Sequence, residues 1–541
     1  MASEVVPPVF LAKLPYFIAC LLLLPIVVLL TLLVPYAFHS SRPKSFPPGP
    51  STIPVLGNLH LIPASRSYVL FHEWRQKYGS MIGLKFGPTN FVILNDFRDV
   101  EALFEKRGAI YSSRPANYIA QELICPDDVH MLFAAYGPGW KLLRRIASTL
   151  LSAKRTQDLL PTQNAEATQT VYDMIRDPEN FDRHIKRLTT SIYLCMVYGQ
   201  RGTRYESPTI QALYDVQVRF TSIVEPGAAP PVDGLTFLQW TPTWLAPWKR
   251  AAAQIRRDHQ KLYLGLLRET RKRVEAGEGT GCFMEGMIAD QEKTGLGDQN
   301  MAYAGGAMME AASDTTSSTL LSFILGLLTN PAVLKKAQAD VDAVCGDQRS
   351  PGLEDVGKFP YIEACVLETL RWRPAAPGGV PHMLTQQDTY KDYVFPAGTV
   401  FLANAWSIHR GEDEYSDPED FVPERWLDNN HFGLKSDGVV KEHQQRKQTY
   451  AFGAGRRICA GQNMAENSLR IAMAKLVWTF DFRTGKSGKV DASPLTAYEG
   501  GFAVCPKKFD ASITPRSKKR AEVIEREFHE LKPFFEQFVN V

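Results

Sequence analysis

The sequence predicts a mainly helical fold with a small β region, preceded by one membrane-spanning helix. Residues 302–328 and 462–480 carry apolar side chains at helical spacing over several turns. Strand-like runs flank the turns at 87–88 and 396–398, as expected for hairpins. An uncharged, mostly apolar run at 14–38 is about 25 residues long, enough to cross a bilayer.

Composition narrows the class of protein further. The chain has 541 residues, of which 45% are hydrophobic, so it can bury a large core. Its net charge of +3 and the lack of a long basic run argue against nucleic acid as a partner. The 8 cysteines are scattered singly without a C-x-x-C pair. This excludes zinc ribbons and dithiol motifs, and it fits a reducing compartment.

The N-terminal apolar run, Leu14 to Phe38, is interpreted as a single membrane anchor. Pro25 and Pro35 would kink such a helix without excluding it. A cleaved signal peptide is the alternative, but the run is long for one and no small-x-small cleavage site follows. Arg42 and Lys44 follow the run, which favours a cytosolic location for the rest of the chain. We expect a single-pass protein of the endoplasmic reticulum membrane.

The next elements begin after residues 46–50, a Pro-rich stretch expected to be a stiff linker. A helix is predicted at 68–78, followed by strands at 81–86 and 90–94. A later helix carries Trp140 and Arg144 at i and i+4, so both donors lie on one face and suit a carboxylate. Taken alone, this pair is more often an ordinary packed helix face.

Residues 161–281 predict several helices, interrupted at 225–232 and by the Trp-rich stretch 240–248. That stretch could form a lid over a substrate, contact a membrane surface or belong to the core, and the sequence does not separate these.

The long apolar helix at 302–328 contains Asp314 and Thr315. An acid inside an apolar helix is costly to bury unless it is used or satisfied. One interpretation is a local helix bend, since a Thr hydroxyl bonds back to the carbonyl four residues earlier. The other is a pair that handles protons at a reaction site.

Glu368 and Arg371 lie at i and i+3 on a predicted helix at 361–373, so they face together. On a surface such a pair stabilises little. Strands are expected at 393–395 and 399–403, and the segments 498–505 and 509–514 are expected to close the domain as a hairpin.

Residues 452–461 read F-G-A-G-R-R-I-C-A-G and end just before the helix at 462–480. Cys459 therefore precedes a helix N-terminus, which favours its thiolate, a soft and electron-donating ligand for iron. Gly455 and Gly461 leave room for a flat cofactor, and Arg457 supplies a cation for its carboxylates. A buried structural cysteine beside a Gly turn is the alternative.

The spacing F-x-x-G-x-R-x-C-x-G resembles the haem-binding loop of the cytochrome P-450 family. The other motifs follow in that family's order: W-x-x-x-R, an Asp-Thr-Thr segment, E-x-x-R and Pro-Glu-Arg-Trp. This resemblance, over roughly residues 46–515, implies the mainly helical P-450 fold. The family usually has Gly where this chain has Ala312, and the extra methyl is expected to narrow the groove there.

The resemblance also implies roles for individual residues. Heme b would be held by Cys459 as axial ligand to the iron and by Phe452, Gly455, Arg457, Gly461, Trp140, Arg144 and His382. Thr315 and Asp314 would be catalytic. Glu368, Arg371 and Arg425 would form a structural triad. The substrate pocket would be lined by Ala311, Ala376, Val380 and Phe502.

The implied function is a monooxygenase that inserts one oxygen atom from O2 into an apolar small molecule. Electrons would come from NADPH through a separate NADPH–cytochrome P-450 reductase, with cytochrome b5 as a second candidate donor. This chain itself shows no G-x-G-x-x-G fingerprint or flavin domain. The overall pattern resembles fungal members of secondary metabolism. Oxidative phenol coupling, a non-catalytic haem-binding protein and an anchored protein without haem are the alternatives.

Three regions are therefore expected. Residues 1–45 would form the membrane anchor and its basic flank, and residues 46–515 the catalytic domain. Residues 516–541 would be a charged amphipathic tail, expected as a solvated helix.

Overall fold

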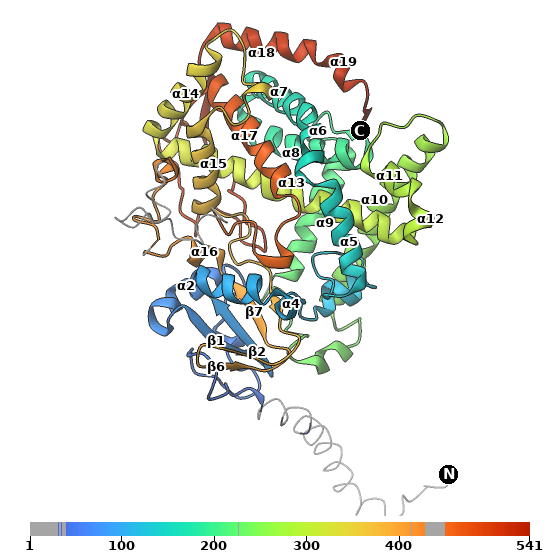
Figure 1. Ribbon diagram of the computed structural model, residues 1–541, viewed down its shortest axis with the longest axis vertical. Helices are drawn as coiled ribbons and strands as arrows, with labels where there is room; N and C mark the ends of the chain where they lie inside the picture. Colours follow the sequence, from blue (N-terminus) through green and yellow to red (C-terminus); the bar gives the residue numbers. More distant parts are fainter. Residues whose placement is uncertain (1–30, 32–33, 35–38, 226, 413, 428–448) are drawn as a thin grey trace, which may run out of the picture.

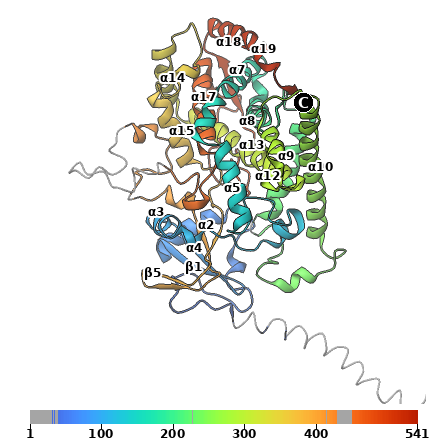
Figure 2. The ribbon, with the colours of Figure 1, turned by 45° about the vertical axis from the view of Figure 1, so that its right-hand side comes forward.

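The computed structural model describes residues 31, 34, 39–225, 227–412, 414–427 and 449–541. Helices make up most of the molecule, and the four-stranded sheet lies at one end beneath them, as both ribbon views show (Figures 1 and 2). The first half of the chain contributes helices α2 (Ser67–Tyr78), α3 (Phe97–Val100), α4 (Gly108–Tyr111), α5 (Pro138–Leu150), α6 (Ala153–Asp158), α7 (Leu160–Arg176), α8 (Phe181–Tyr198), α9 (Pro208–Val224) and α10 (Pro247–Glu275). The second half contributes α11 (Phe283–Ala289), α12 (Gln291–Thr294), α13 (Asp298–Thr329), α14 (Pro331–Cys345), α15 (Pro360–Trp372), α16 (Ala405–Ile408), α17 (Gln462–Thr479), α18 (Lys518–Glu530) and α19 (Lys532–Phe535).

Helix α13 forms the centre of the helical part. Its residues are buried around most of its circumference, which explains why the sequence shows a long apolar run rather than one apolar stripe. It packs against α8, α10 and α17 in the largest hydrophobic cluster. The helix ends at Thr329, because Pro331 disfavours helical backbone at Asn330, the residue before it.

The main sheet joins strands that are far apart in the sequence. Strands β1 (Met81–Phe86) and β2 (Thr89–Leu94) form an antiparallel hairpin around Gly87, whose φ of 59° suits glycine. Strand β7 (Val400–Ala403) pairs in parallel with β2, and β4 (His382–Met383) pairs antiparallel with β7. The mainly helical fold with a small β region is therefore confirmed.

Two expected hairpins are wrong in their pairing. Strand β6 (Tyr393–Phe395) pairs with β5 (Asp388–Tyr390), whereas the neighbouring β7 joins the main sheet. Strand β9 (Ala511–Pro515) pairs with β8 (Phe480–Thr484), and residues 498–505 contribute only a single bridge between Tyr498 and Pro506. Local turn signals located these strands but did not identify partners that the tertiary fold supplies.

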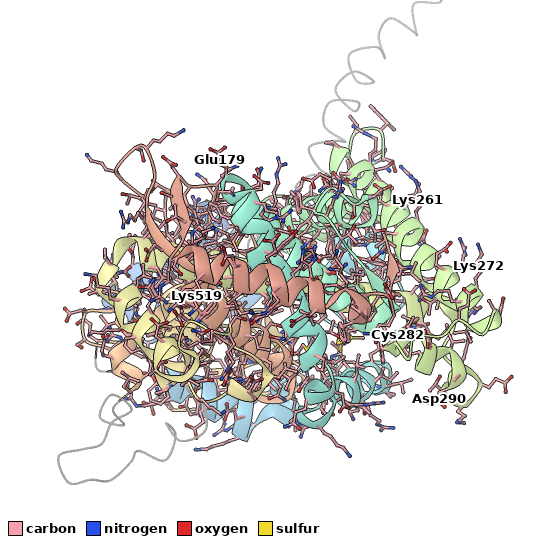
Figure 3. All side chains as sticks on the ribbon, turned by 90° about the horizontal axis from the view of Figure 1, so that it is seen from above. Glu179, Lys261, Lys272, Cys282, Asp290 and Lys519 are labelled. Carbon is pink, nitrogen blue, oxygen red and sulfur yellow. The ribbon has the colours of Figure 1, made fainter. Side chains whose placement is uncertain are left out.

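The C-terminal segment packs onto the domain. The apolar face of α18 buries Val523 and Ile524, and its other face is charged. Seen from above, α18 crosses over the helical part, with Lys519 near its start (Figure 3). Strand β10 (Val539–Asn540) pairs in parallel with β3 (Gln200–Arg201). The expected amphipathic helix is present, with one face buried rather than fully solvated.

The predicted anchor at 14–38 lies outside the described residues, apart from Thr31 and Val34. Within the described ranges no single helix is long and apolar enough to cross a bilayer. Helices α13 and α14, which meet at a bend of 113°, pass that test only as a pair, by length and composition.

Candidate functional site

The cysteine loop closes on itself just before α17. The Cys459 N–H donates to the Phe452 carbonyl at 2.9 Å, which brings the two ends of the loop together. Gly455 has a φ of 63°, and a Cβ there would lie 2.0 Å from the Phe104 carbonyl oxygen, so neighbouring backbone requires this glycine. At Gly461 a Cβ would meet only ordinary contacts, 3.9 Å from the Cys459 sulfur.

The surroundings of the Cys459 thiol act on its pKa in a way that the sequence did not predict. Burial raises the pKa of its thiol, and the Gly461 N–H and the Arg144 guanidinium offset only part of this rise. The helix N-terminus alone therefore does not produce a thiolate. A bound metal cation would produce the thiolate, because coordination to a metal deprotonates a thiol.

Cys459 and helix α13 both open onto internal space. Burial dominates the pKa of Cys459, yet its side chain is exposed, which places the sulfur in the wall of a cavity. In the middle of the largely buried α13, Ala311 is exposed and Ala307 and Thr315 are half-buried. These three positions share one face of the helix, each four residues from the next. The neighbouring Ala312 is buried in the core, so its methyl packs away from this open face.

A cluster of arginines lies beside the cysteine loop, with Arg114 buried and Arg144 and Arg457 half-buried. Arg457 donates to the carbonyls of Ser112 and Ala134 at 2.8 and 2.7 Å, and its guanidinium stacks over the Trp140 ring at 4.0 Å. Burial and the neighbouring Arg144 lower the pKa of Arg457 to about 9.

Arg114 belongs to the same cluster. It donates to the carbonyls of Leu132 and Val380 at 3.0 and 3.1 Å. Burial and the nearby Arg457 hold the pKa of Arg114 well below its usual value. Arg144 donates to the Ile458 carbonyl at 2.6 Å and so reaches the cysteine loop directly.

His382 completes the cluster, stacked on Phe104 with ring centroids 3.9 Å apart. Its Nδ1 lies 2.8 Å from the Tyr111 carbonyl, and burial with the nearby arginines lowers its pKa. Across the part of the chain that the structure describes, none of the three guanidiniums forms an ion pair with a carboxylate. Cations that are wholly or partly removed from water without an acidic partner are unfavourable, so an anionic ligand is expected there.

The two predicted catalytic side chains have different partners. The Thr315 hydroxyl donates to the Ala311 carbonyl at 2.7 Å, the local bond that the bend interpretation requires. Asp314 is half-buried, and burial raises the pKa of its carboxyl, which Lys186 on α8 lowers in part. Within the described residues no hydrogen bond joins the Asp314 carboxyl to the Thr315 hydroxyl.

The predicted triad residues lie together in the interior. Arg371 donates to both Glu368 oxygens, at 2.8 and 2.7 Å, and Arg425 donates to one of them at 3.2 Å. All three side chains are buried. Two further donors satisfy the same carboxylate, the Val422 N–H and the Trp426 indole, each at 2.8 Å.

The predicted pocket residues lie on segments that meet at α13. The Val504 N–H donates to the Ala375 carbonyl at 2.8 Å, and Ser318 of α13 donates to the Val504 carbonyl at 2.6 Å. This places the turn that carries Phe502 beside Ala376, and both side chains are half-buried. Val380 is also half-buried.

Comparison with known proteins agrees with this geometry. The sequence profile of the family described as Cytochrome P-450 matches residues 47–512. The chain belongs to the cytochrome P-450 family. It is 37% identical to the cytochrome P-450 monooxygenase patH of Aspergillus clavatus, over 96% of this chain and 99% of the relative. It is 36% identical to yanC of Aspergillus niger and to macC of Penicillium terrestre, two cytochrome P-450 monooxygenases, in each case over 92% of this chain and 95% of the relative. The protein is thus an oxidoreductase of the monooxygenase class.

This P-450 has a site that fits the haem that its family implies. A haem needs a soft axial donor, a flat space and cations for its two carboxylates. The exposed sulfur of Cys459 meets the first requirement, and the small side chains of Ala307 and Ala311 on the open face of α13 leave room for the second. The guanidiniums of Arg114, Arg144 and Arg457, which form no ion pair within the described residues, meet the third, with Trp140 and His382 alongside them.

Sequence reasoning missed three residues of this P-450 site. Ala307 extends the open face of α13, and the spacing 307, 311 and 315 could have revealed it. Arg114 lies next to Pro115 in a segment without a regular pattern. Its positive charge was the only signal that could have identified it. His409 accepts from the Tyr450 N–H at 2.9 Å and its carbonyl accepts from Arg371 at 3.2 Å, so it links the triad to the start of the cysteine loop.

Proposed function

We propose that this P-450 inserts one oxygen atom from O2 into an apolar small molecule at a haem held by Cys459. The observation that carries this proposal is the Cys459 thiol, which faces internal space beside the guanidiniums of Arg114, Arg144 and Arg457. Within the described residues these three form no ion pair with a carboxylate. When bound, the haem iron would supply the oxidising chemistry, with the electron-rich thiolate favouring cleavage of the O–O bond. The protein would orient the substrate and exclude water.

The cluster residues would hold the cofactor in one orientation. Arg114, Arg144 and Arg457 would neutralise its carboxylates, with the Trp140 and His382 side chains beside them. Phe452 would contact the cofactor from the cysteine loop, and Gly461 would leave space next to the sulfur. The buried Glu368, Arg371 and Arg425 triad would keep the preceding segment in place.

Asp314 and Thr315 would supply protons on the open face of α13. Because burial raises the pKa of the Asp314 carboxyl, this group holds a proton at a higher pH than an exposed Asp. The Thr315 hydroxyl, once rotated away from the Ala311 carbonyl, would donate its proton into the cavity and regain one from water. Since the two side chains are not hydrogen-bonded, a water molecule would have to connect them.

The substrate would lie between α13 and the segments that carry Ala376, Val380 and Phe502. Half-buried apolar side chains there and the exposed Ala311 suit an apolar molecule. The fungal relatives, each a cytochrome P-450 monooxygenase, support the monooxygenase reaction. The resemblance of the sequence pattern to fungal members of secondary metabolism favours a substrate of that kind. Oxidative phenol coupling stays the alternative, and product mass separates the two. Insertion adds one oxygen, whereas coupling doubles the mass less two hydrogens.

The protein would be anchored in the endoplasmic reticulum membrane by residues 14–38, with the catalytic domain of residues 46–515 in the cytosol. The exposed Trp240 and Trp244, 77% and 74% accessible, support contact with the membrane surface. They follow Gly234, which packs against Gly87 in the β1–β2 turn at the sheet end of the molecule. Electrons would come from NADPH through a separate reductase, with cytochrome b5 as a second donor.

The experiment that tests this proposal is the absorption spectrum of the haem-fed protein after reduction and addition of carbon monoxide. The wild type is expected to show the red-shifted band of a thiolate-bound haem. Cys459→Ala should lose that band, whereas Cys365→Ala, which removes a buried thiol on α15, should keep it. A folded wild type that takes up haem without this band would refute the proposal.

A further inference from the structure

Residues 130–134 form a tight turn between the π-helical segment η3 (Tyr118–Ile124) and α5, and all five of its carbonyls accept hydrogen bonds. The His130 carbonyl accepts from the N–H groups of Phe133 and Ala134, both at 3.1 Å. The other four carbonyls accept from side chains: Met131 from Arg457 at 3.3 Å, Leu132 from Arg114 at 3.0 Å, Phe133 from Gln121 at 2.6 Å and Ala134 from Arg457 at 2.7 Å. Two of the proposed haem-anchoring arginines are therefore held by this turn.

The opposite side of the turn is tied to helix α13. His130 Nε2 lies 3.3 Å from Oε2 of Glu310, the residue before the cavity-facing Ala311. Both side chains are buried. Glu310 also contacts His259 at 3.0 Å and accepts a bond from the Tyr263 hydroxyl, both on α10. Burial alone would raise the pKa of Glu310, but His259 and His130 hold it well below the usual value, so the carboxylate is charged.

The hydrogen bonds of His130 define its tautomer. Its Nδ1 accepts from the Leu132 N–H at 3.3 Å, within the turn itself. An Nδ1 that accepts carries no proton, so the proton lies on Nε2 and points at Glu310. The His130 ring therefore links two elements: its Nδ1 accepts a hydrogen bond from the turn, and its Nε2–H donates one to Glu310 of α13. Its ring also packs against Phe133 and Phe220, at centroid distances of 5.3 and 5.7 Å.

We propose that His130 is a positioning residue: its bond to Glu310 fixes the turn 130–134 and, through its carbonyls, the direction of the Arg114 and Arg457 guanidiniums. This inference rests on the proposed haem site. Three of the guanidinium hydrogen bonds end on the turn, so a displaced turn removes acceptors from both arginines at once. The arginines would then lose the fixed direction in which they meet the cofactor's carboxylates.

The test compares three variants of the full chain. His130→Phe keeps a ring between Phe133 and Phe220 but loses the N–H that Glu310 accepts. His130→Gln restores an N–H donor of similar reach. Tyr263→Phe is the matched control, because it removes another donor from the same carboxylate without touching the turn. One measurement is the rate of haem transfer to excess apomyoglobin. The other is hydrogen exchange of the Phe133 and Ala134 amides in the haem-free protein.

For His130→Phe we expect both rates to rise about tenfold or more, the usual effect of losing a hydrogen bond to a charged group. His130→Gln should stay close to the wild type, and Tyr263→Phe should leave exchange at Phe133 and Ala134 unchanged. The proposal is overturned if His130→Phe matches the wild type in both rates, or if Tyr263→Phe raises them equally. A wild type that binds no haem would refute the proposed function, while amide exchange would still decide the role of His130.

Discussion

Replacing Glu368 by alanine tests whether the buried triad holds the segment that leads to the cysteine loop. The Glu368 carboxylate accepts from five donors, among them the guanidiniums of Arg371 and Arg425, and none of these three side chains is more than 3% exposed. Removing the acid would leave two cations buried without their partner. Breaking a buried pair in this way costs about 3–5 kcal/mol.

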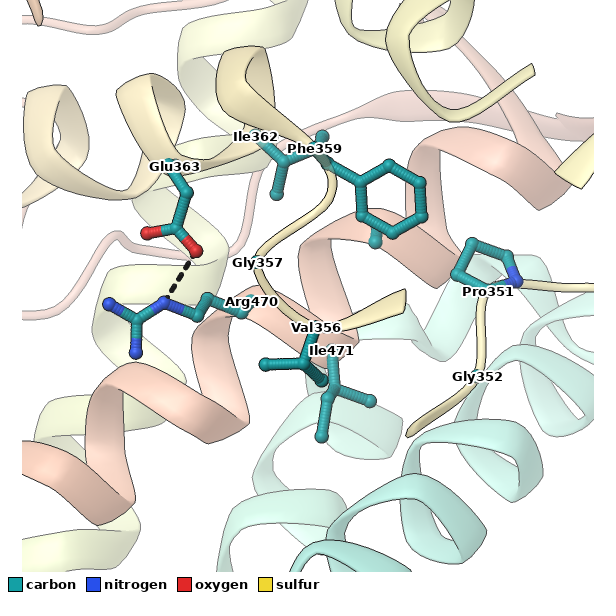
Figure 4. Close-up of a pocket in the computed structure, with 10 residues that line it drawn as sticks. Pro351, Gly352, Val356, Gly357, Phe359, Ile362, Glu363, Arg470 and Ile471 are labelled. Carbon is teal, nitrogen blue, oxygen red and sulfur yellow. Dashed lines mark hydrogen bonds and ion pairs between the residues drawn. The ribbon is translucent and has the colours of Figure 1, made fainter. Parts of the chain in front are cut away.

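The matched control lies on the same helix. Glu363 of α15 pairs with Arg470 at 2.6 Å beside a small pocket (Figure 4), but its side chain is 30% exposed. An exposed pair contributes only about 0–1 kcal/mol, so Glu363→Ala should be nearly neutral. For 541 residues the entropy of unfolding is about 1 kcal/mol per degree. Differential scanning fluorimetry should therefore show a loss in Tm of roughly 3–5 °C for Glu368→Ala and about 1 °C or less for Glu363→Ala. Equal losses in the two variants would refute the buried-triad reasoning.

Three further predictions concern other parts of the molecule. Burial lowers the pKa of His409 to about 3, so the unfolded chain binds one more proton below about pH 6.5. Lowering the pH from 7 to 5 should then reduce the free energy of unfolding of the wild type by about 2 kcal/mol more than that of His409→Gln, as measured from the denaturation midpoints of both proteins. An equal dependence of stability on pH in the two proteins would contradict this. Thr315→Ala should raise peroxide release per NADPH consumed. Thr319→Ala should not, although it removes a similar hydrogen bond from a Thr hydroxyl to the carbonyl four residues earlier. Identical peroxide yields in the two variants would contradict the role of Thr315 in proton delivery. Glu527→Ala should destabilise the protein by about 1–3 kcal/mol. The substitution removes from α18 the carboxylate that accepts a hydrogen bond from Ser350, which lies beside the buried Lys475. An unchanged Tm would show that this contact of the C-terminal helix does not stabilise the core.

Sequence patterns predicted the parts of this P-450 that depend on neighbours along the chain. The helix spacing at 302–328 and 462–480 reflects burial of those helices, so α13 and α17 could be located closely. The spacing within the cysteine loop likewise brought Phe452 and Cys459 together, joined by one backbone hydrogen bond. Such features require no knowledge of distant segments.

Features that depend on distant partners were missed or misassigned. Strand β7 pairs with β2, about 300 residues earlier, because the tertiary fold rather than the local turn decides its neighbour. Arg114 and His130 have no distinctive spacing, and their roles arise only when residues 130–134 fold between the cysteine loop and α13. The burial that raises the pKa of the Cys459 thiol likewise comes from the whole fold and has no signature in the local sequence.

The most direct test of the central claim is the iron–sulfur stretching band in the resonance Raman spectrum of the haem-loaded protein. We predict that labelling cysteine with a heavy sulfur isotope lowers the frequency of this band, and that Cys459→Ala abolishes it. A band that does not respond to the isotope, or that survives in Cys459→Ala, would contradict ligation of the iron by Cys459.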